Sequence, residues 1–255
     1  MITIRKLSKT FKGRKALQGV DLQIENGQVQ ALLGANGSGK STLIYLLSGL
    51  LPADGGTCHI NDQIITMDTY QYRSQVGYVF EKPLYIEKFS AREYLHFVGA
   101  LYDLPKEVYQ SRVEELLAFM SLPTDNRQYI ESYSKGMKNK VSLAAALIHQ
   151  PQYLILDEPF DGIDFVSVQK ISKLLKTLAA KGVTILITSH QYDIIAELSD
   201  QFALLKAGVI HFNLTMPQLE AFAARGFPEE KYPVKAYLES LMDDSQDKNE
   251  LSWNI

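Results

Sequence analysis

Gly34-Ala35-Asn36-Gly37-Ser38-Gly39-Lys40-Ser41 decides the fold of this chain, because its residue types and spacing are those of a phosphate-binding P-loop. Glycines at both ends let backbone N–H groups curl round the phosphates of a nucleotide without a side chain in the way. Lys40 supplies a mobile positive charge, and the hydroxyl of Ser41 is placed to bind Mg²⁺. The residues expected to bind nucleotide in this segment are Gly34, Asn36, Gly37, Ser38, Gly39, Lys40, Ser41 and Thr42.

The sequence on either side of the loop agrees with this interpretation. Residues 29–33 are typical of a buried strand that enters the loop, and residues 42–47 are typical of a helix that leaves it. The N-terminal end of such a helix carries a partial positive charge that favours phosphate. The sequence therefore predicts an α/β fold with a P-loop NTPase core, and a bound nucleoside triphosphate.

Composition limits the other possibilities. At 255 residues, of which 46% are apolar, the chain can form one large domain or one domain with an inserted subdomain. The net charge of −3 gives no general attraction to nucleic acid, so we expect no nucleic-acid partner. The single cysteine, Cys58, is expected as a small buried residue in a strand. No apolar run reaches about 18 residues, which predicts a cytoplasmic protein that needs another polypeptide to span a membrane.

The periodicity of apolar residues changes along the first part of the chain. Residues 1–7 and 17–24 read as strands, which predicts an N-terminal antiparallel β subdomain, and short strands follow over 53–80. From residue 90 to residue 120 the pattern is helical. We therefore expect an inserted α-helical subdomain over about 85–150.

After Pro151 the α/β pattern returns. The expected elements are strands at 153–156 and 183–188, a helix at 165–180, a hairpin over 202–212, and helices at 216–224 and 233–242. The short, nearly continuous apolar runs suit central strands of a mixed or parallel sheet that is covered on both faces. This organisation predicts one domain over residues 1–212, followed by a helical extension with a polar acidic tail over 213–255, of which 243–249 are expected to be disordered.

Two carboxylates follow the apolar strand at 153–156. Asp157, at the tip of the strand, can hold Mg²⁺ through its water shell, and Glu158 is one step closer to the γ-phosphate. Glu158 could there polarise the attacking water as a general base. The alternative is that both acids are merely solvated turn residues, but the P-loop elsewhere in the chain favours the catalytic interpretation.

A third motif lies between these two. Ser134-Lys135-Gly136-Met137 precedes a strongly helical run, and Ser134 is well suited to cap that helix. A helix N-terminus with Ser and Gly is also an anion site. The order of the P-loop, this motif, the acidic pair and His190 resembles the ATP-binding cassette (ABC) family of ATPases, and the resemblance covers about residues 1–212.

The resemblance implies roles for particular residues. Phe11 would stack on adenine, although it could instead be a core aromatic of an edge strand. Ser134 and Gly136 would close over the γ-phosphate bound by the opposite subunit, and Asp164 would lie in the loop that crosses the dimer interface. His190 would contact the γ-phosphate, and would act with Lys40 and Glu158 in catalysis.

Three departures from the family pattern matter. Glu81 stands where Gln is usual, so it could bind Mg²⁺ directly or be an exposed loop acid. Lys135 replaces a glycine, and could attract the anion or face solvent. The crossing loop has Asp161-Gly162-Ile163 where Ser-Ala-Leu is usual. None of these changes removes a residue that hydrolysis requires, so we expect an active site.

The departures are similar to those of cassettes that serve exporters with separate membrane and ATPase chains. The resemblance implies a subunit that binds and hydrolyses ATP with Mg²⁺, and that drives export through a separate transmembrane permease subunit. Two ATPase subunits, identical or pseudo-symmetric, would close on ATP at the inner face of the cell membrane. The permease would dock on Pro83, Leu84, Tyr85, Ile86 and Phe89, unless these residues pack internally. The alternatives are a soluble ABC-type ATPase acting on ribosomes or nucleic acid, and a nucleotide-gated regulatory module for which Glu81 is the only support.

Overall fold

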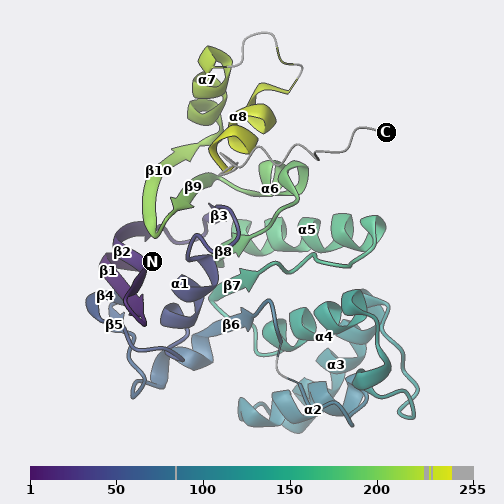
Figure 1. Cartoon of the computed structure of the whole chain (residues 1–255). Coiled ribbons are helices and arrows are strands. Elements are labelled where there is room, and N and C mark those ends of the chain that lie inside the picture. The colour runs from purple at the N-terminus through teal and green to yellow at the C-terminus, as the bar shows by residue number, and fades with distance from the viewer. Residues whose placement is uncertain (84, 227–229, 231, 243–255) are drawn as a thin grey trace, which may run out of the picture.

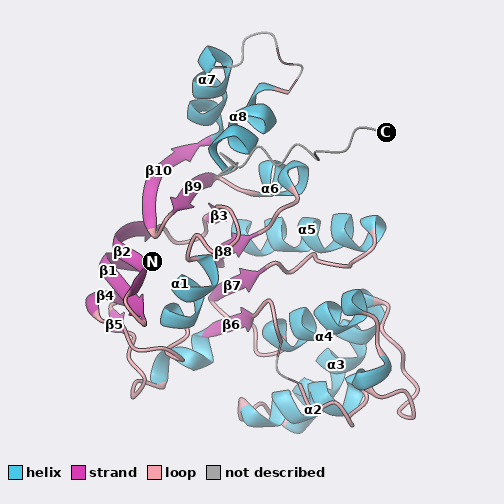
Figure 2. Cartoon of the chain, viewed as in Figure 1, coloured by secondary structure: helices cyan, strands magenta, loops and turns pink. Residues whose placement is uncertain are grey.

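The computed structural model describes residues 1–83, 85–226, 230 and 232–242 of the chain. The smaller, four-stranded sheet and one helix lie on one face of the larger, six-stranded sheet, and further helices cover its other face (Figures 1 and 2). Helices α2 (Ala91–Leu101), α3 (Lys106–Met120) and α4 (Lys135–Leu147) gather at one end of the molecule, while α7 (Met216–Gly226) and α8 (Pro233–Met242) lie at the other (Figure 1). Among the described residues, none of the helices is both long and apolar enough to cross a bilayer.

The smaller sheet is the N-terminal antiparallel one that the sequence predicts. Its spatial order is β2 (Arg14–Ile24), β1 (Ile2–Phe11), β4 (Gly55–Ile60) and β5 (Gln63–Ile64). Strand β1 runs to Phe11, beyond the predicted end at residue 7. The register of β1 shifts at three places and Lys6 has a φ of 48°, which breaks the in-out alternation that sequence periodicity detects. Cys58 is buried on β4, as predicted.

The larger sheet is mixed and carries the P-loop. Its spatial order is β10 (Val209–Thr215), β9 (Gln201–Lys206), β3 (Val29–Leu33), β8 (Thr184–Thr188), β7 (Tyr153–Asp157) and β6 (Val76–Val79). The strands from β9 to β6 are parallel, and β10 returns antiparallel to β9. Every residue of β3, β7 and β8 is buried, which explains their continuous apolar sequences.

The two faces of this sheet pack into different cores. Alternate residues such as Leu32 and Ile155 join a cluster with α1 (Lys40–Leu47) and the small sheet. The residues next to them in each strand, such as Ala31 and Leu154, point to the opposite face of the sheet. They join a second cluster with α4 (Lys135–Leu147), α5 (Phe165–Ala180) and α6 (Tyr192–Leu198). Since β3, β7 and β8 are parallel neighbours, their carboxyl ends meet at one edge of the sheet. The P-loop follows β3, the acidic pair lies at the end of β7, and His190 follows β8, so all three lie at that edge.

The sequence pattern is helical without a break from residue 90 to residue 120, but the structure has two separate helices over this stretch. The helices of the predicted helical region are α2 (Ala91–Leu101), α3 (Lys106–Met120) and α4, with a short 3₁₀ turn at Ile130–Ser132. A second 3₁₀ turn, Gln71–Gln75, lies outside this region, directly before β6. The helix ends at Leu101 because Asp103 has a φ of 53° and Pro105 cannot continue a helix. Ser90 and Glu93 form a reciprocal capping box that starts α2.

The last two described helices cover one end of the larger sheet. These are α7 (Met216–Gly226) and α8 (Pro233–Met242), close to the bounds that the sequence predicts. Leu219 and Leu238 are buried in the cluster that contains Phe202 of β9. The helices therefore extend the core. The predicted acidic tail, residues 243–249, lies outside the described residues.

Candidate nucleotide-binding and hydrolysis site

A cavity of about 800 Å³ opens at the edge of the sheet where β3, β7 and β8 end. It is lined by the P-loop, by the end of β1, by the loops after β6, β7 and β8, and by the β9–β10 turn. The residues that the sequence singles out and that line this cavity are Phe11, Asn36, Gly37, Gly39, Lys40, Ser41, Thr42, Glu81, Asp157, Glu158 and His190. The structure thus brings most of the predicted site together in one place.

Lys40 lies at the centre of the P-loop. Its Nζ donates hydrogen bonds to the carbonyl oxygens of Gly34, at 2.7 Å, and Ala35, at 3.2 Å. Burial lowers the pKa of the Lys40 amine, and the negative charges of Glu158, Asp157 and Glu81 oppose that shift. An ammonium group has three N–H donors, so a third remains for a phosphate oxygen.

The loop is packed so closely that one of its glycines is required. A Cβ atom on Gly39 would lie 2.6 Å from the carbonyl oxygen of Ala16 and 2.8 Å from a methyl carbon of Leu17, and its φ is 112°. Ser38 Oγ is buried and has no hydrogen-bond partner among the described residues. Ser38 does not line the cavity, so it is the Lys40 amine and the close approach of the loop backbone that fit the phosphates of a nucleotide.

The acidic pair occupies the tip of β7. Asp157 is buried, and its Oδ1 accepts a hydrogen bond from Thr188 Oγ1 at 2.7 Å. Asp157 and Ser41 line the same cavity, and a carboxylate with a hydroxyl is a donor set that Mg²⁺ accepts. The sequence does not single out Thr188, because a threonine at the end of a strand rich in β-branched residues carries no pattern that distinguishes it from its neighbours.

Glu158 is held in an unusual backbone conformation. Its φ is 49°, in the left-handed region, and its N–H donates to Thr188 Oγ1 at 3.0 Å. Its Oε2 accepts from the backbone N–H of His190 at 3.2 Å, and its Oε1 lies 3.2 Å from His190 Nε2. Burial raises the pKa of the Glu158 carboxyl, and the nearby charges of His190 and Lys40 oppose the shift. A half-buried carboxylate with a raised pKa suits a general base.

Phe11 and Glu81 form the rim of the cavity. Phe11 is 45% exposed at the end of β1, so the alternative of a core aromatic is wrong. Glu81 is exposed and lines the cavity, and its charge acts on the pKa of Lys40. The Phe11 ring, with Lys9 Nζ 5.6 Å from its centroid, and the Glu81 side chain are thus both at the mouth of the cavity.

Comparison with known proteins identifies this arrangement. A family model described as ABC transporter matches residues 17–161, more than half of the chain. The chain belongs to the ABC transporter family. Daunorubicin resistance ATP-binding protein DrrA3 of Streptomyces coeruleorubidus is 31% identical over 220 residues, which are 86% of this chain and 70% of that protein.

Solved structures agree with this assignment. An ATP-binding subunit of an ABC transporter superposes with a TM-score of 0.83 at 28% identity, covering 93% of this chain and 99% of the other. A dimeric ATP-binding cassette in a post-hydrolysis state with ADP and Pi has the same fold, with a TM-score of 0.78 at 24% identity and coverage of 85% and 99%. The protein is the ATP-binding subunit of an ABC transporter, and its activity is ATP hydrolysis.

Five predicted site residues of this ABC ATPase do not line the cavity: Gly34 and Ser38 are in the P-loop, and Ser134, Gly136 and Asp164 lie at the starts of α4 and α5. Ser134 caps α4, where its Oγ accepts from the N–H of Met137 at 3.2 Å. Asp164 caps α5 and accepts from the N–H of Ser167 at 2.9 Å. Gly136 packs so closely on Gly162 that a Cβ atom there would overlap the Gly162 carbonyl oxygen. Ser134, Gly136 and Asp164 form a second cluster, next to the crossing loop, and do not line the cavity of their own chain.

Side chains of α4 bind the crossing loop of the ABC ATPase. Lys135 forms an ion pair with Asp161 and keeps 64% of its side chain exposed, so it faces solvent, which was one of the two alternatives for this residue. Asn139 Nδ2 donates to the carbonyl oxygen of Asp161 at 2.7 Å. Asp161 also lines the nucleotide cavity. The crossing loop therefore links the Ser134 cluster directly to the cavity.

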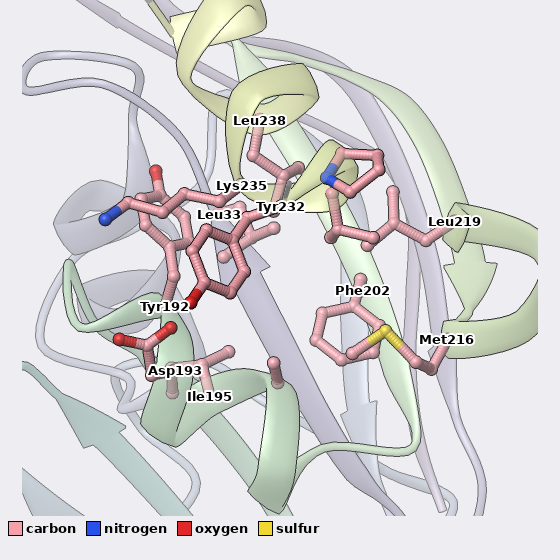
Figure 3. A pocket seen from close by; sticks show the side chains of 13 residues that line it. Leu33, Tyr192, Asp193, Ile195, Phe202, Met216, Leu219, Tyr232, Lys235 and Leu238 are labelled. Atoms are coloured by element: carbon pink, nitrogen blue, oxygen red, sulfur yellow. The ribbon is translucent and has the colours of Figure 1, made fainter. Parts of the chain in front are cut away.

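A second, smaller cavity of about 240 Å³ lies under the C-terminal helices (Figure 3). Tyr192 and Asp193 of α6 face it from one side, and Lys235 and Leu238 of α8 from the other (Figure 3). Leu33, the residue before the P-loop, also lines it. The C-terminal helices of the ABC ATPase thus pack against the helix that follows His190 and the strand that enters the P-loop.

Proposed function

We propose that this chain is the ATPase subunit of an exporter, in which two ATPase subunits close on Mg-ATP and thereby move a separate transmembrane permease subunit. The protein would be cytoplasmic and peripheral on the inner face of the cell membrane. The daunorubicin-resistance function in the name of the relative DrrA3 supports export as the direction.

The observation that carries this proposal is the separation of two half-sites in one chain. Lys40, Asp157, Glu158 and His190 surround the cavity, while the Ser134 helix end does not line it. Ser134 is exposed at a helix N-terminus, where backbone N–H groups favour an anion. Two copies facing head to tail would place each Ser134 helix end over the nucleotide of the other copy, with two-fold symmetry.

The residues around the cavity have distinct proposed roles. Phe11 stacks on the adenine, and the P-loop N–H groups with Lys40 bind the phosphates. Ser41 and Asp157 hold Mg²⁺, with Glu81 as a further ligand, and the ion neutralises phosphate charge when bound. Glu158 accepts the proton of the attacking water, and His190 positions the γ-phosphate.

The surface proposed for the permease is only partly exposed. Tyr85 and Phe89 are half-buried, and the Phe89 ring packs edge-on against Phe97 with centroids 6.1 Å apart. Ile86 is 37% and Phe97 is 41% exposed. Leu84 lies outside the described residues. We therefore place the permease contact on Ile86 and Phe97.

Trapping the closed dimer tests the proposal. Glu158→Gln keeps the shape of the side chain but removes the base, so this variant should elute as an ATP-bound dimer from a size-exclusion column in Mg-ATP. Lys40→Ala, which cannot bind the phosphates, should remain monomeric. The same Glu158→Gln variant, pulled down from native membranes in Mg-ATP, should recover a multi-spanning protein. Recovery of ribosomal or nucleic-acid complexes without a membrane protein would reject the transporter.

A further inference from the structure

The hydroxyl of Thr188, the last residue of β8, binds both residues of the acidic pair. Thr188 Oγ1 donates to Asp157 Oδ1 at 2.7 Å and accepts from the backbone N–H of Glu158 at 3.0 Å. We propose that Thr188 is a positioning residue for ATP hydrolysis, which holds the carboxylate of Asp157 and the backbone of Glu158 in one fixed arrangement. The inference rests on the proposed roles of Asp157 and Glu158.

The geometry leaves the hydroxyl little freedom. A threonine hydroxyl has one hydrogen to donate, and Asp157 takes it, so the lone pairs face the N–H of Glu158. Asp157 and Thr188 are also register partners in the ladder between β7 and β8. The strand pairing therefore fixes the two Cα atoms, and the hydroxyl fixes the carboxylate that extends from one of them.

Burial makes this bond hard to replace. Thr188 is 0% exposed and Asp157 is 3% exposed. Removal of the hydroxyl would leave a buried carboxylate oxygen and the N–H of Glu158 without this partner, and a buried polar group in that state is unfavourable. The local structure would be expected to rearrange so as to satisfy these groups, which would move both acids.

The backbone of Glu158 depends on the same bond. A residue other than glycine in the left-handed region is strained, and it persists there only when its surroundings hold it. With its φ of 49°, Glu158 is such a residue, and Thr188 binds its N–H. Release of that N–H would let the peptide relax and carry the carboxylate away from its present position.

His190 extends the arrangement toward the nucleotide. It lies two residues beyond Thr188, and its backbone N–H donates to Glu158 Oε2 at 3.2 Å. The end of β8 thus binds the Asp157 carboxylate, the Glu158 backbone and the Glu158 carboxylate. A shift of either acid by about 1 Å can reduce the rate about 100-fold without loss of substrate binding.

Thr184, at the other end of β8, provides a matched control. It is also buried, at 1% exposure, and its Oγ1 accepts from the N–H of Gly27 at 3.1 Å. Thr184 does not line the nucleotide cavity. Thr184→Val removes a buried hydroxyl from the same strand, so it reproduces the effect on stability without touching the acidic pair.

The test is steady-state ATP hydrolysis by the full chain, with nucleotide affinity measured separately by titration. We expect Thr188→Val to lower kcat about 30- to 100-fold while the Kd for ATP changes less than about threefold. Thr188→Ser keeps the hydroxyl and should restore kcat to within about threefold of the wild type. Thr184→Val should hydrolyse ATP at close to the wild-type rate.

Several results would overturn the inference. A kcat within about threefold of the wild type in Thr188→Val, or no recovery in Thr188→Ser, would reject a role for the hydroxyl. An equal loss of kcat in Thr184→Val would assign the effect to general weakening of β8. If Thr188→Val does not fold, Thr188→Cys, which has only a weak donor, replaces it, and a wild-type kcat there would reject the inference. ATP hydrolysis by Glu158→Gln is measured in the same assay. If that variant keeps its activity, the proposed role of Glu158 is rejected.

Discussion

Lys140, in the second turn of the helix that Ser134 caps, places its Nζ 3.0 Å from Oδ2 of Asp164, the residue that caps α5. The same amine donates to Ser167 Oγ at 2.6 Å. Only 10% of the Lys140 side chain is exposed. A buried amine therefore ties the helix proposed to meet a partner's nucleotide to the loop proposed to cross the dimer interface.

Lys140→Met should reduce the stability of the protein. It removes two hydrogen bonds from a buried amine but keeps most of the volume, so we expect the free energy of unfolding to fall by about 1–2 kcal/mol. Urea denaturation measures the difference. Lys173→Met, on the exposed surface of α5, is the control for loss of a positive charge and should change the stability by less than about 0.5 kcal/mol. Equal effects of the two substitutions would contradict this role for Lys140.

Phe11→Ala should weaken nucleotide binding and leave the fold intact. Loss of an aromatic platform under a base costs about 1–3 kcal/mol, which corresponds to a Kd for ATP at least about fivefold higher. Phe11→Tyr keeps the ring and should bind like the wild type. Because Phe11 is 45% exposed, the melting temperature should hardly move. Titration with a fluorescent ATP analogue measures the Kd, and an unchanged value in Phe11→Ala would remove Phe11 from the adenine site.

In the absence of Mg²⁺, Glu81→Gln should tighten the binding of ATP at low ionic strength. The substitution removes a negative charge that faces the same cavity as the phosphates, and a repulsion of this kind is worth about 0.3–1 kcal/mol near a surface. We expect a Kd about two- to fivefold lower, and a smaller effect in 0.5 M salt, since salt screens exposed charges. Calorimetric titration at two salt concentrations tests this. With Mg²⁺ present, weaker binding of ATP by the variant than by the wild type would support Glu81 as a ligand of the ion, and tighter binding would reject that role.

His149 should make the protein less stable in mild acid. Burial lowers the pKa of its imidazole to about 4, from an ordinary value of 6.5. Between these values the unfolded chain binds a proton that the folded chain does not, so the free energy of unfolding falls as the pH drops below about 6.5. The ring is only half-buried, and solvent screening limits the loss to about 1 kcal/mol at pH 5.

His149→Phe isolates this contribution to the pH dependence. The ring of His149 stacks on Tyr102 with centroids 3.7 Å apart, and Phe preserves that contact. The stability lost between pH 7.5 and pH 5 should be smaller in His149→Phe than in the wild type, when both are measured by urea denaturation. His211→Asn, at an exposed histidine, serves as the control. A pH dependence that is identical in all three proteins would exclude His149 as the cause.

Local sequence patterns were sufficient for the elements that carry the site. The strand, loop and helix around Lys40 follow directly from P-loop spacing, and the acid pair after β7 follows from a buried apolar strand that ends in Asp157. Both are short-range signals, because the chemistry and the turn are encoded within about ten residues.

The contacts that sequence reasoning missed all join distant segments. Thr188 meets Asp157 from a position 31 residues away, and Lys140 meets Asp164 from 24 residues away. No periodicity links such pairs, since only the packing of the strands and helices brings them together. The pairing of Lys135 with Asp161 was missed for the same reason, although both residues were recognised as departures from the family pattern.

Cys58 makes the chain suitable for measuring the motion that the proposed function requires. It is the only cysteine in the sequence, and it is buried on β4, where burial raises the pKa of its thiol to about 11. A thiol that is both protonated and covered reacts slowly with maleimides at neutral pH. A single exposed cysteine introduced on α5, for example Lys173→Cys, could therefore carry a spin label or a dye without removal of the native residue. Distances between two labelled copies would then report opening and closing directly.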